Sequence, residues 1–247
     1  MDLLLEATRR AERDHFWFRG FRRFVGPAVA SAARGRRDLR ILDCGCGTGV
    51  NFPMLDRYGS VFGFDLNDRG LGFARQSGRT RIARASIGRI PFGAGTFDLV
   101  TSFDVLQTLP ADVEREAATE LHRVLRPGGV LVLNVAALDV LFGNHSVLAE
   151  EVRRYGRAGL RRLLEGAGFR IERLTFTNFS LFPLMLAVRS AQRALGLRPP
   201  ERAEAEISVP PAIVNKPLEW LLALEALAVR HVNMPVGSSL LCVARKG

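Results

Sequence analysis

The 247-residue chain is long enough for one substantial domain, and a composition of 47% hydrophobic and 24% charged residues excludes a disordered or fibrous protein. Its net charge of +10 is carried almost entirely by arginine, because Lys216 and Lys246 are the two lysines. No recognisable nucleic-acid-binding module accompanies this charge, so it indicates a solvated basic face rather than a nucleic-acid footprint.

Cysteine content and apolar runs indicate the compartment. Three cysteines, Cys44, Cys46 and Cys242, give neither a disulfide framework nor a closed zinc site, so we expect no metal and a reducing, cytoplasmic setting. The first ten residues lack the charge order of a secretory signal, and no apolar run reaches membrane-spanning length. We expect no transmembrane segment, which leaves peripheral membrane contact open.

The N-terminal segment, residues 1–37, is predicted to be a helical lid. Within it, residues 1–26 have the pattern of one or two amphipathic helices, with Trp17, Phe21 and Phe24 on a stripe set among arginines.

Residues 38–179 are predicted to form an α/β core. Short apolar runs at 40–45, 61–65, 97–103, 130–135 and 169–176 suit strands buried on both faces. Helical patterns at 111–125 and 158–169 lie between them, and this alternation predicts parallel strands joined by crossover helices.

The C-terminal part is predicted to differ from this core. Residues 180–236 contain two apolar helical stretches, 181–195 and 216–229, separated by the proline-rich segment 197–211. We interpret them as a helical insertion or cap. Residues 237–247 then supply a last strand of the core.

A glycine-rich turn follows the first predicted strand. Asp43, Gly45, Gly47 and Gly49 stand at alternate positions, which lets the backbone pass close to a ligand at the start of a helix. The dinucleotide fingerprint requires glycine where Val50 stands, so it is disfavoured. Asp65 ends the next strand, where a carboxylate can accept both hydroxyls of a ribose. The pattern predicts a nucleotide-like ligand.

Four stretches together resemble a known family: "ILDCGCGTG" (41–49), "VFGFDLN" (61–67), "IPFGAGTFDLVTSFDVLQTL" (90–109) and "ELHRVLRPGGVLVL" (120–133). They are similar to the successive motifs of class I S-adenosylmethionine-dependent methyltransferases, in the branch resembling ubiquinone and menaquinone biosynthetic methyltransferases. The resemblance implies a Rossmann-like sheet of seven strands with the last strand antiparallel. It also implies S-adenosyl-L-methionine as cofactor and S-adenosyl-L-homocysteine as product.

The resemblance assigns roles by position. The turn would hold the methionine part of the cofactor, Asp65 the ribose and Leu66 the adenine, while Phe103 and Asp104 would lie under the methyl group. Ser86 stands where relatives carry an aspartate for the adenine amino group. The expected cofactor-binding residues are Asp43, Gly45, Cys46, Gly47, Gly49, Asp65, Leu66, Ser86, Ile87 and Phe103.

Three residues are candidates for catalysis: His145, His15 and Tyr155. His145 lies just beyond the strand at 130–135, and His15 lies in "DHFWFRG", which resembles the lid of one bacterial subgroup. Tyr155 ends "RRY", a triplet of the same subgroup. The alternatives are a helix-capping histidine at position 15 and an exposed helix start at 153–155.

We expect a small, apolar or lipid-linked acceptor. The segment "HFWF" and the helical insertion would cover it, and Arg189 and Arg193 would face an anionic group. The plainer alternative is that the insertion packs as a lid or dimer contact, in a monomer or homodimer. Methylation of RNA or protein is a second interpretation. A non-catalytic S-adenosylmethionine-binding scaffold is a third.

Overall fold

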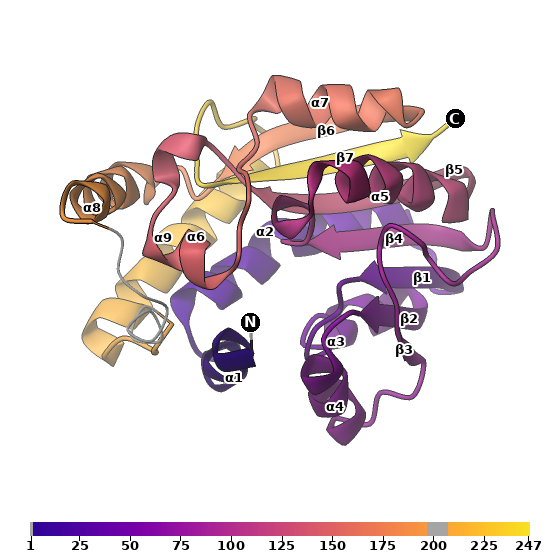
Figure 1. Cartoon of the computed structure of the whole chain (residues 1–247), viewed down its shortest axis with the longest axis horizontal. Coiled ribbons are helices and arrows are strands. Elements are labelled where there is room, and N and C mark those ends of the chain that lie inside the picture. The colour runs from indigo at the N-terminus through magenta and orange to yellow at the C-terminus, as the bar shows by residue number, and fades with distance from the viewer. Residues whose placement is uncertain (1, 197–206) are drawn as a thin grey trace.

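The sheet has seven strands in the order β3-β2-β1-β4-β5-β7-β6 (Figure 1). The computed structural model describes residues 2–196 and 207–247, with side chains from residue 6 onward. β7 runs antiparallel to both β5 and β6, and the other pairings are parallel, as the family resemblance implied. The strands are β1 Leu39–Cys44, β2 Gly59–Asp65, β3 Ile82–Arg84, β4 Phe97–Phe103, β5 Leu125–Ala136, β6 Phe169–Thr177 and β7 Ser239–Lys246.

Helices cover both faces of this sheet. The described helices are α1 Asp2–Ala11, α2 Phe16–Ala33, α3 Phe52–Leu55, α4 Asp68–Gln76, α5 Ala111–Val124, α6 Asn144–Leu148, α7 Arg157–Gly166, α8 Phe182–Ala194 and α9 Ala212–Val229. Short 3-10 turns lie at η1 Asp56–Tyr58, η2 Leu106–Thr108 and η3 Asp139–Leu141. Part of the predicted proline-rich separator, residues 197–206, lies outside the described residues.

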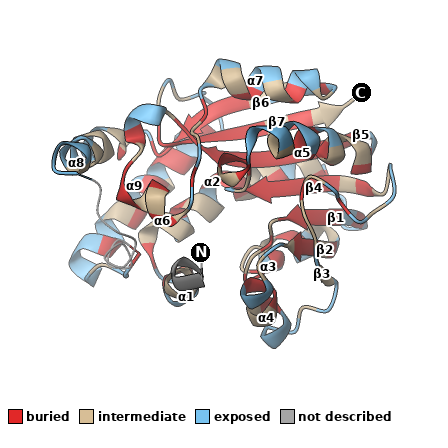
Figure 2. Cartoon of the chain, viewed as in Figure 1, coloured by how far each residue is buried: buried red, intermediate tan, exposed pale blue. Residues whose placement is uncertain are grey.

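The core is divided by the alternation of side chains along each strand. Leu42 of β1 faces the buried side chains of α5 and α7, whereas its neighbour Ile41 faces those of α2 and α3. Figure 2 shows the central strands buried along most of their length, while exposed residues gather on α8 and on the outer part of α9. The core therefore lies in two layers, one on each face of the sheet.

The carboxyl ends of β1, β2 and β4 meet at one edge of the sheet, because these strands are parallel neighbours. In doubly wound folds, ligands bind at this edge. Within the described part of the chain, no helix is long and apolar enough to cross a bilayer. The same residues contain no cluster of three metal-ligating side chains.

Candidate functional site

The glycine turn adopts a backbone that requires glycine. Gly45, Gly47 and Gly49 have φ values of 76°, 50° and 76°, in the left-handed region. A Cβ at position 45 would also lie 2.2 Å from Cγ2 of Val105. The turn therefore excludes side chains at its first glycine through both strain and space.

Asp65 is held in place by the turn and by the start of the next helix. Its Oδ2 accepts a hydrogen bond of 2.8 Å from N–H of Gly47, and its Oδ1 accepts one of 2.8 Å from N–H of Asn67. The side chain is half-buried at the end of β2. Because each carboxylate oxygen has two lone pairs, Asp65 retains acceptor capacity for a ligand.

Asp43 lies beneath the turn and is almost completely buried. Its Oδ1 accepts a hydrogen bond of 2.7 Å from the Thr101 hydroxyl, whereas Oδ2 has no hydrogen-bond partner in the described structure. Burial, assisted by the nearby charge of Asp65, raises the pKa of Asp43 to about 7. A buried carboxylate with a free oxygen is suited to a cationic partner.

A cavity of about 550 Å³, called here the central cavity, opens beside the turn. Gly45, Asp65, Leu66, Ile87 and Phe103 line one end of it. Aromatic and aliphatic side chains line the other end, including Phe16, Trp17 and Phe18 from α2, Leu184 and Met185 from α8, and Leu218 from α9. One continuous space thus joins the glycine turn to an apolar roof.

The remaining expected cofactor-binding residues do not border this cavity. Cys46 is buried in the turn, and Gly47 acts through its N–H on Asp65. The Ser86 hydroxyl accepts a hydrogen bond of 3.2 Å from N–H of Gly88. Asp43 and Gly49 are likewise absent from the lining of the central cavity. Of these five residues, Gly49 instead borders a second cavity, which the turn's threonine, Thr48, also lines.

The N-terminal segment closes over the turn. Directly after α1, the buried Glu12 accepts a hydrogen bond of 2.8 Å at Oε2 from the Thr48 hydroxyl. Burial raises the pKa of Glu12, and the Thr48 hydrogen bond opposes that rise. The guanidinium of Arg9 lies 4.0 Å from the ring centroid of Phe73 on α4. These contacts fix the predicted lid against the core.

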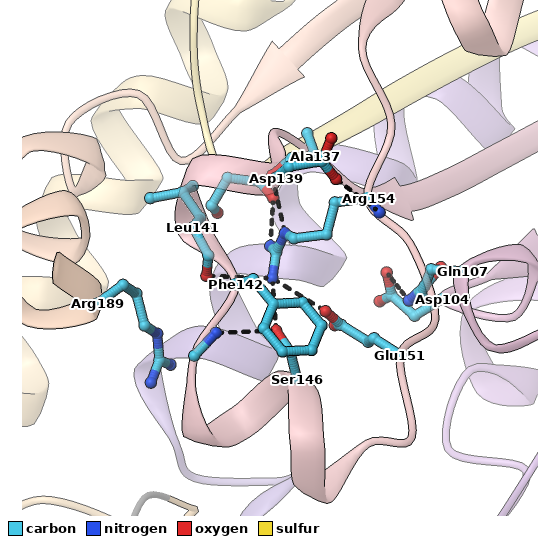
Figure 3. Close-up of polar contacts among 12 residues, drawn as sticks. Asp104, Gln107, Ala137, Asp139, Leu141, Phe142, Ser146, Glu151, Arg154 and Arg189 are labelled. Atoms are coloured by element: carbon cyan, nitrogen blue, oxygen red, sulfur yellow. Dashed lines mark hydrogen bonds and ion pairs between the residues drawn. The ribbon is translucent and has the colours of Figure 1, made fainter. Parts of the chain in front are cut away.

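Asp104 follows β4 and lines the central cavity with a strained backbone, at φ 58°. One of its oxygens accepts a hydrogen bond of 2.9 Å from the side-chain amide of Asn134. The Gln107 amide lies 3.5 Å from the same oxygen (Figure 3). Burial raises the pKa of Asp104 to about 6, close to neutrality.

Arg154 organises the loop that follows β5. Its buried guanidinium donates to the Ala137 carbonyl at 2.9 Å, the Ser146 hydroxyl at 3.0 Å and Oε2 of Glu151 at 3.0 Å (Figure 3). It also contacts the carbonyl of Ser238, just before β7. Burial lowers the pKa of Arg154, although Glu151 opposes this effect. Sequence reasoning missed this network, because it brings Arg154 to Ser238, which lies 84 residues away along the chain.

The two candidate histidines line the same cavity, although they are far apart in the sequence. His15 caps α2: its Nδ1 accepts a hydrogen bond of 3.1 Å from N–H of Trp17, and burial lowers its pKa. Neutral His15 therefore carries its proton on Nε2. His145 lies on α6, in the loop that Arg154 braces.

Tyr155 does not border the central cavity. Its buried hydroxyl contacts the Glu114 carboxylate and the Leu106 carbonyl, and burial raises the pKa of the phenol. Arg153 forms an ion pair of 3.0 Å with the same Glu114. The predicted triplet is thus anchored to the start of α5.

The two arginines expected to face an anionic group are placed differently. Arg189 borders the central cavity and donates to Oε1 of Gln192 at 2.7 Å. Arg193 donates to the Phe142 carbonyl at 2.9 Å and is not among the lining residues. The structure therefore brings one of this pair to the cavity.

Comparisons with known proteins agree with this geometry. Residues 42–133 match the family model described as "Methyltransferase domain". A malonyl-[acyl-carrier protein] O-methyltransferase from Enterobacter lignolyticus is 37% identical over 116 residues, which are 46% of this chain and 45% of that protein. A demethylmenaquinone methyltransferase from Lactiplantibacillus plantarum is 36% identical over 106 residues, covering 38% and 44% of the two chains. The chain spans about half the length of the curated relatives it matches.

The fold itself matches solved structures over the whole chain. The crystal structure of an S-adenosylmethionine-dependent methyltransferase from Thermotoga maritima superposes with a TM-score of 0.60 at 15% identity, covering 100% of this chain and 99% of that one. At this identity the likeness shows the fold, which is that of the class I methyltransferases.

Proposed function

We propose that this chain, of which residues 42–133 match the methyltransferase-domain model, is an S-adenosylmethionine-dependent methyltransferase that transfers a methyl group from that cofactor to a small apolar or lipid-linked acceptor. The observation that carries this proposal is the central cavity, which connects the glycine turn and Asp65 to the apolar roof of α2, α8 and α9. A cofactor seated at one end then has an acceptor-sized apolar space beside it.

The residues present fit the cofactor. Asp65 offers an oriented carboxylate for the ribose hydroxyls, and Leu66 and Ile87 offer apolar contact for the adenine. The unpartnered Oδ2 of Asp43 and its raised pKa suit the ammonium of the methionine part, because a cation would stabilise the ionised carboxylate. Ser86 remains our proposed contact for the adenine amino group. When bound, the cofactor supplies an electrophilic methyl group on a sulfonium.

The main task of the protein in such a transfer is to hold the acceptor in line, which contributes up to about 7–11 kcal/mol in well-oriented reactions. Phe16, Trp17 and Leu218 are placed to exclude water around an apolar acceptor. Phe103, packed edge-on against Phe21 with ring centroids 5.3 Å apart, fixes the floor of the cavity.

Asp104 is our proposed proton acceptor where the acceptor group must lose a proton. Its pKa of about 6 leaves it ionised at neutral pH yet basic enough to take a proton. His15 has its Nδ1 lone pair engaged by Trp17, so we assign it a donor role through Nε2–H. We assign His145 to acceptor positioning. Tyr155 is left outside the chemistry, since it lies away from the cavity.

An apolar or lipid-linked acceptor is supported by the roof residues and by Arg189 at the cavity edge, which suits an anionic group on the same molecule. The two relatives named above are described as acting on a carrier-protein-linked malonyl group and on demethylmenaquinone. We place the enzyme in a reducing, cytoplasmic setting, in keeping with three buried free cysteines, as a monomer or homodimer.

Calorimetry with S-adenosyl-L-homocysteine tests the cofactor assignment. We expect Asp65→Asn to weaken binding by about 10-fold or more, because charge-assisted hydrogen bonds contribute about 1.5–3 kcal/mol. The matched control is Asp68→Asn, a carboxylate three residues away that is exposed and paired with Arg84. Equal affinity of the Asp65 variant and the wild type would contradict the proposed site.

A transfer assay with methyl-labelled cofactor then tests the acceptor. Quinols, isoprenoids and acyl thioesters are compared with polar amines and with total RNA. Turnover of the apolar group supports the proposal. Turnover confined to RNA or polar acceptors contradicts it, and tight cofactor binding with no turnover of any acceptor favours the scaffold alternative.

A further inference from the structure

Helix α9 turns its two glutamates and its asparagine toward the protein, whereas Lys216 is exposed. Glu219 is buried and forms ion pairs of 3.1 Å with Arg19 and 3.0 Å with Arg23, both on α2. Asn215 is also buried: its Oδ1 accepts a hydrogen bond of 2.8 Å from N–H of Phe16, and its Nδ2 donates to the Asp14 carbonyl. These contacts fasten α9 along the start of α2.

Glu225, six residues after Glu219, is also directed toward the protein. Its carboxylate is buried and accepts hydrogen bonds of 2.8 Å and 2.9 Å from the backbone N–H groups of Phe179 and Ser180. Both carboxylates of α9 are thus engaged in ion pairs or hydrogen bonds with the rest of the protein. The helix is bound to the core by its acids, together with Leu222, Ala226 and Val229.

The outer face of α9 is apolar apart from the exposed Lys216. Ile213, Trp220, Leu224 and Leu227 are 83%, 69%, 67% and 53% exposed, although they are among the largest apolar side chains of the helix. Their spacing of seven, four and three residues places them on one stripe. The same face carries no acidic side chain, because Glu219 and Glu225 point inward. An exposed apolar stripe of this kind marks an interaction surface.

This stripe forms one wall of a basic groove. A cavity of about 1480 Å³, called here the arginine groove, is bordered by Trp220, Leu224 and Leu227 on the α9 side. Glu12, already held by Thr48, is the one carboxylate among its described lining residues. Seven arginines also line it: Arg13, Arg19, Arg22, Arg23, Arg57, Arg79 and Arg230.

We propose that this face docks on the surface of an anionic phospholipid bilayer. The α9 stripe would lie at the boundary of headgroups and acyl chains, with the arginines of the groove against the lipid phosphates. Tryptophan and leucine beside arginines are the composition of helices that lie in a membrane interface. The docking is peripheral, since no helix in the described ranges is able to span the bilayer.

Charge complementarity favours a bilayer over a second copy of the chain. A two-fold dimer through this face would bring the arginine groove of one copy opposite that of the other. Arg19 and Arg23 are already paired with Glu219, and Arg79 with Asp56, so the excess positive charge rests on Arg13, Arg22, Arg57 and Arg230. Like charges facing one another across an interface oppose association. An anionic lipid surface instead offers negative charge beside the groove and apolar chains beside the stripe.

The docking face and the central cavity share two helices. Phe16 and Trp17 of α2 and Leu218 of α9 border the cavity, while Trp220 and Leu224 of α9 form the docking stripe. A docked enzyme would hold its apolar roof close to the membrane that contains lipid-linked acceptors. The docking itself is independent of the proposed methyl transfer and is tested without it.

Flotation of the full chain with vesicles tests the docking. We expect binding to vesicles of equal phosphatidylcholine and phosphatidylglycerol, little binding to pure phosphatidylcholine, and release in 0.5 M salt. Trp220→Gln with Leu224→Gln should lower the partition coefficient by at least about tenfold, because two large apolar contacts are lost. Arg57→Gln with Arg230→Gln should also lower it.

Two controls keep the test specific. Val152→Gln changes an exposed valine in the loop before α7, and Arg162→Gln changes an exposed arginine of α7, on the opposite face of the sheet. Both should bind like the wild type, and circular dichroism should show every variant folded. Unchanged vesicle binding by the Trp220/Leu224 variant would overturn the proposal. The proposal would also be overturned if the wild type failed to bind vesicles and instead formed dimers that the Trp220/Leu224 substitutions abolish in sedimentation experiments.

Discussion

The Thr48 hydroxyl donates a hydrogen bond of 2.8 Å to Oε2 of Glu12, which joins the glycine turn to the segment between α1 and α2. Both side chains are largely buried, so removing one leaves the other without its hydrogen bond at a position with little access to bulk water. This contact links closure of the lid to the shape of the ligand-binding turn.

Replacing Thr48 with valine removes the donor and leaves the Glu12 carboxylate buried without this partner. We expect the segment around residues 12–14 to open, with faster trypsin cleavage at Arg13 and several-fold weaker binding of S-adenosyl-L-homocysteine. Limited proteolysis and calorimetry measure the two effects. Thr119→Val is the control, since it removes one exposed hydroxyl contact on α5. An unchanged cleavage rate would show that the contact does not hold the lid.

Asp104→Asn should lower kcat by about 10²-fold for an acceptor that must lose a proton, the lower range for removal of a general base. The pKa of Asp104 is raised to about 6, so in the wild type activity should fall as the pH drops through that value and the carboxylate becomes protonated. The variant should lack this acidic limb. A pH profile of kcat measures it, and a limb that persists near pH 6 in the variant would assign it to another group.

Asp43 should make stability depend on pH in the ligand-free protein. Its folded-state pKa, raised to about 7 by burial, exceeds its unfolded value, so the fold favours the protonated form. The contribution is therefore fully present below about pH 4 and is lost as the pH rises through 7.

Asp43→Asn imitates the protonated carboxyl. We expect it to raise the free energy of unfolding at pH 8 by about 1–3 kcal/mol relative to the wild type, with a smaller difference at pH 5. Urea unfolding at both pH values measures this, and calorimetry should show weaker cofactor binding. A pH-independent difference between the two proteins would argue against the raised pKa.

Much of the sheet could be predicted, because most of its strands are short runs of apolar residues that are buried on both faces. The segments at 40–45, 61–65, 97–103 and 130–135 all correspond to strands, and their apolar side chains contact helices on both faces. β3 was not predicted, since Ile82–Arg84 is a three-residue edge strand without an apolar run. Helix α4 was also missed. Its glycines obscure the pattern, and it is secured by the Asn67 cap and by buried Leu71.

The candidate site likewise has a part that could be predicted from the sequence and a part that could not. The turn and Asp65 could be predicted, because their contacts are local or join neighbouring strands. The Arg154 network could not be predicted, because it joins the loop after β5 to Ser238 before β7. For α9, the apolar pattern predicted a helix of a cap that roofs the acceptor or packs as a lid or dimer contact. It did not reveal that both glutamates would face inward and leave Trp220 exposed.

The contact of α2 with α9 depends on the absence of a side chain at Gly20. A Cβ there would lie 2.4 Å from Cδ1 of Leu222, which is fully buried. Gly20→Ala should therefore separate the two helices and lower the free energy of unfolding by about 1–3 kcal/mol, as overpacking does. Thermal or urea unfolding measures the change.

Gly72→Ala is the matched control for Gly20→Ala. Gly72 also lies inside a helix, α4, but a Cβ at that position meets no atom within 4 Å. Alanine is favoured over glycine in a helix, so this variant should be stabilised by about 0.5–1 kcal/mol. The two substitutions are chemically identical and should have opposite signs. If Gly20→Ala were stabilised as well, α2 and α9 would have room to adjust, and the roof of the central cavity would be less rigid than this close contact requires.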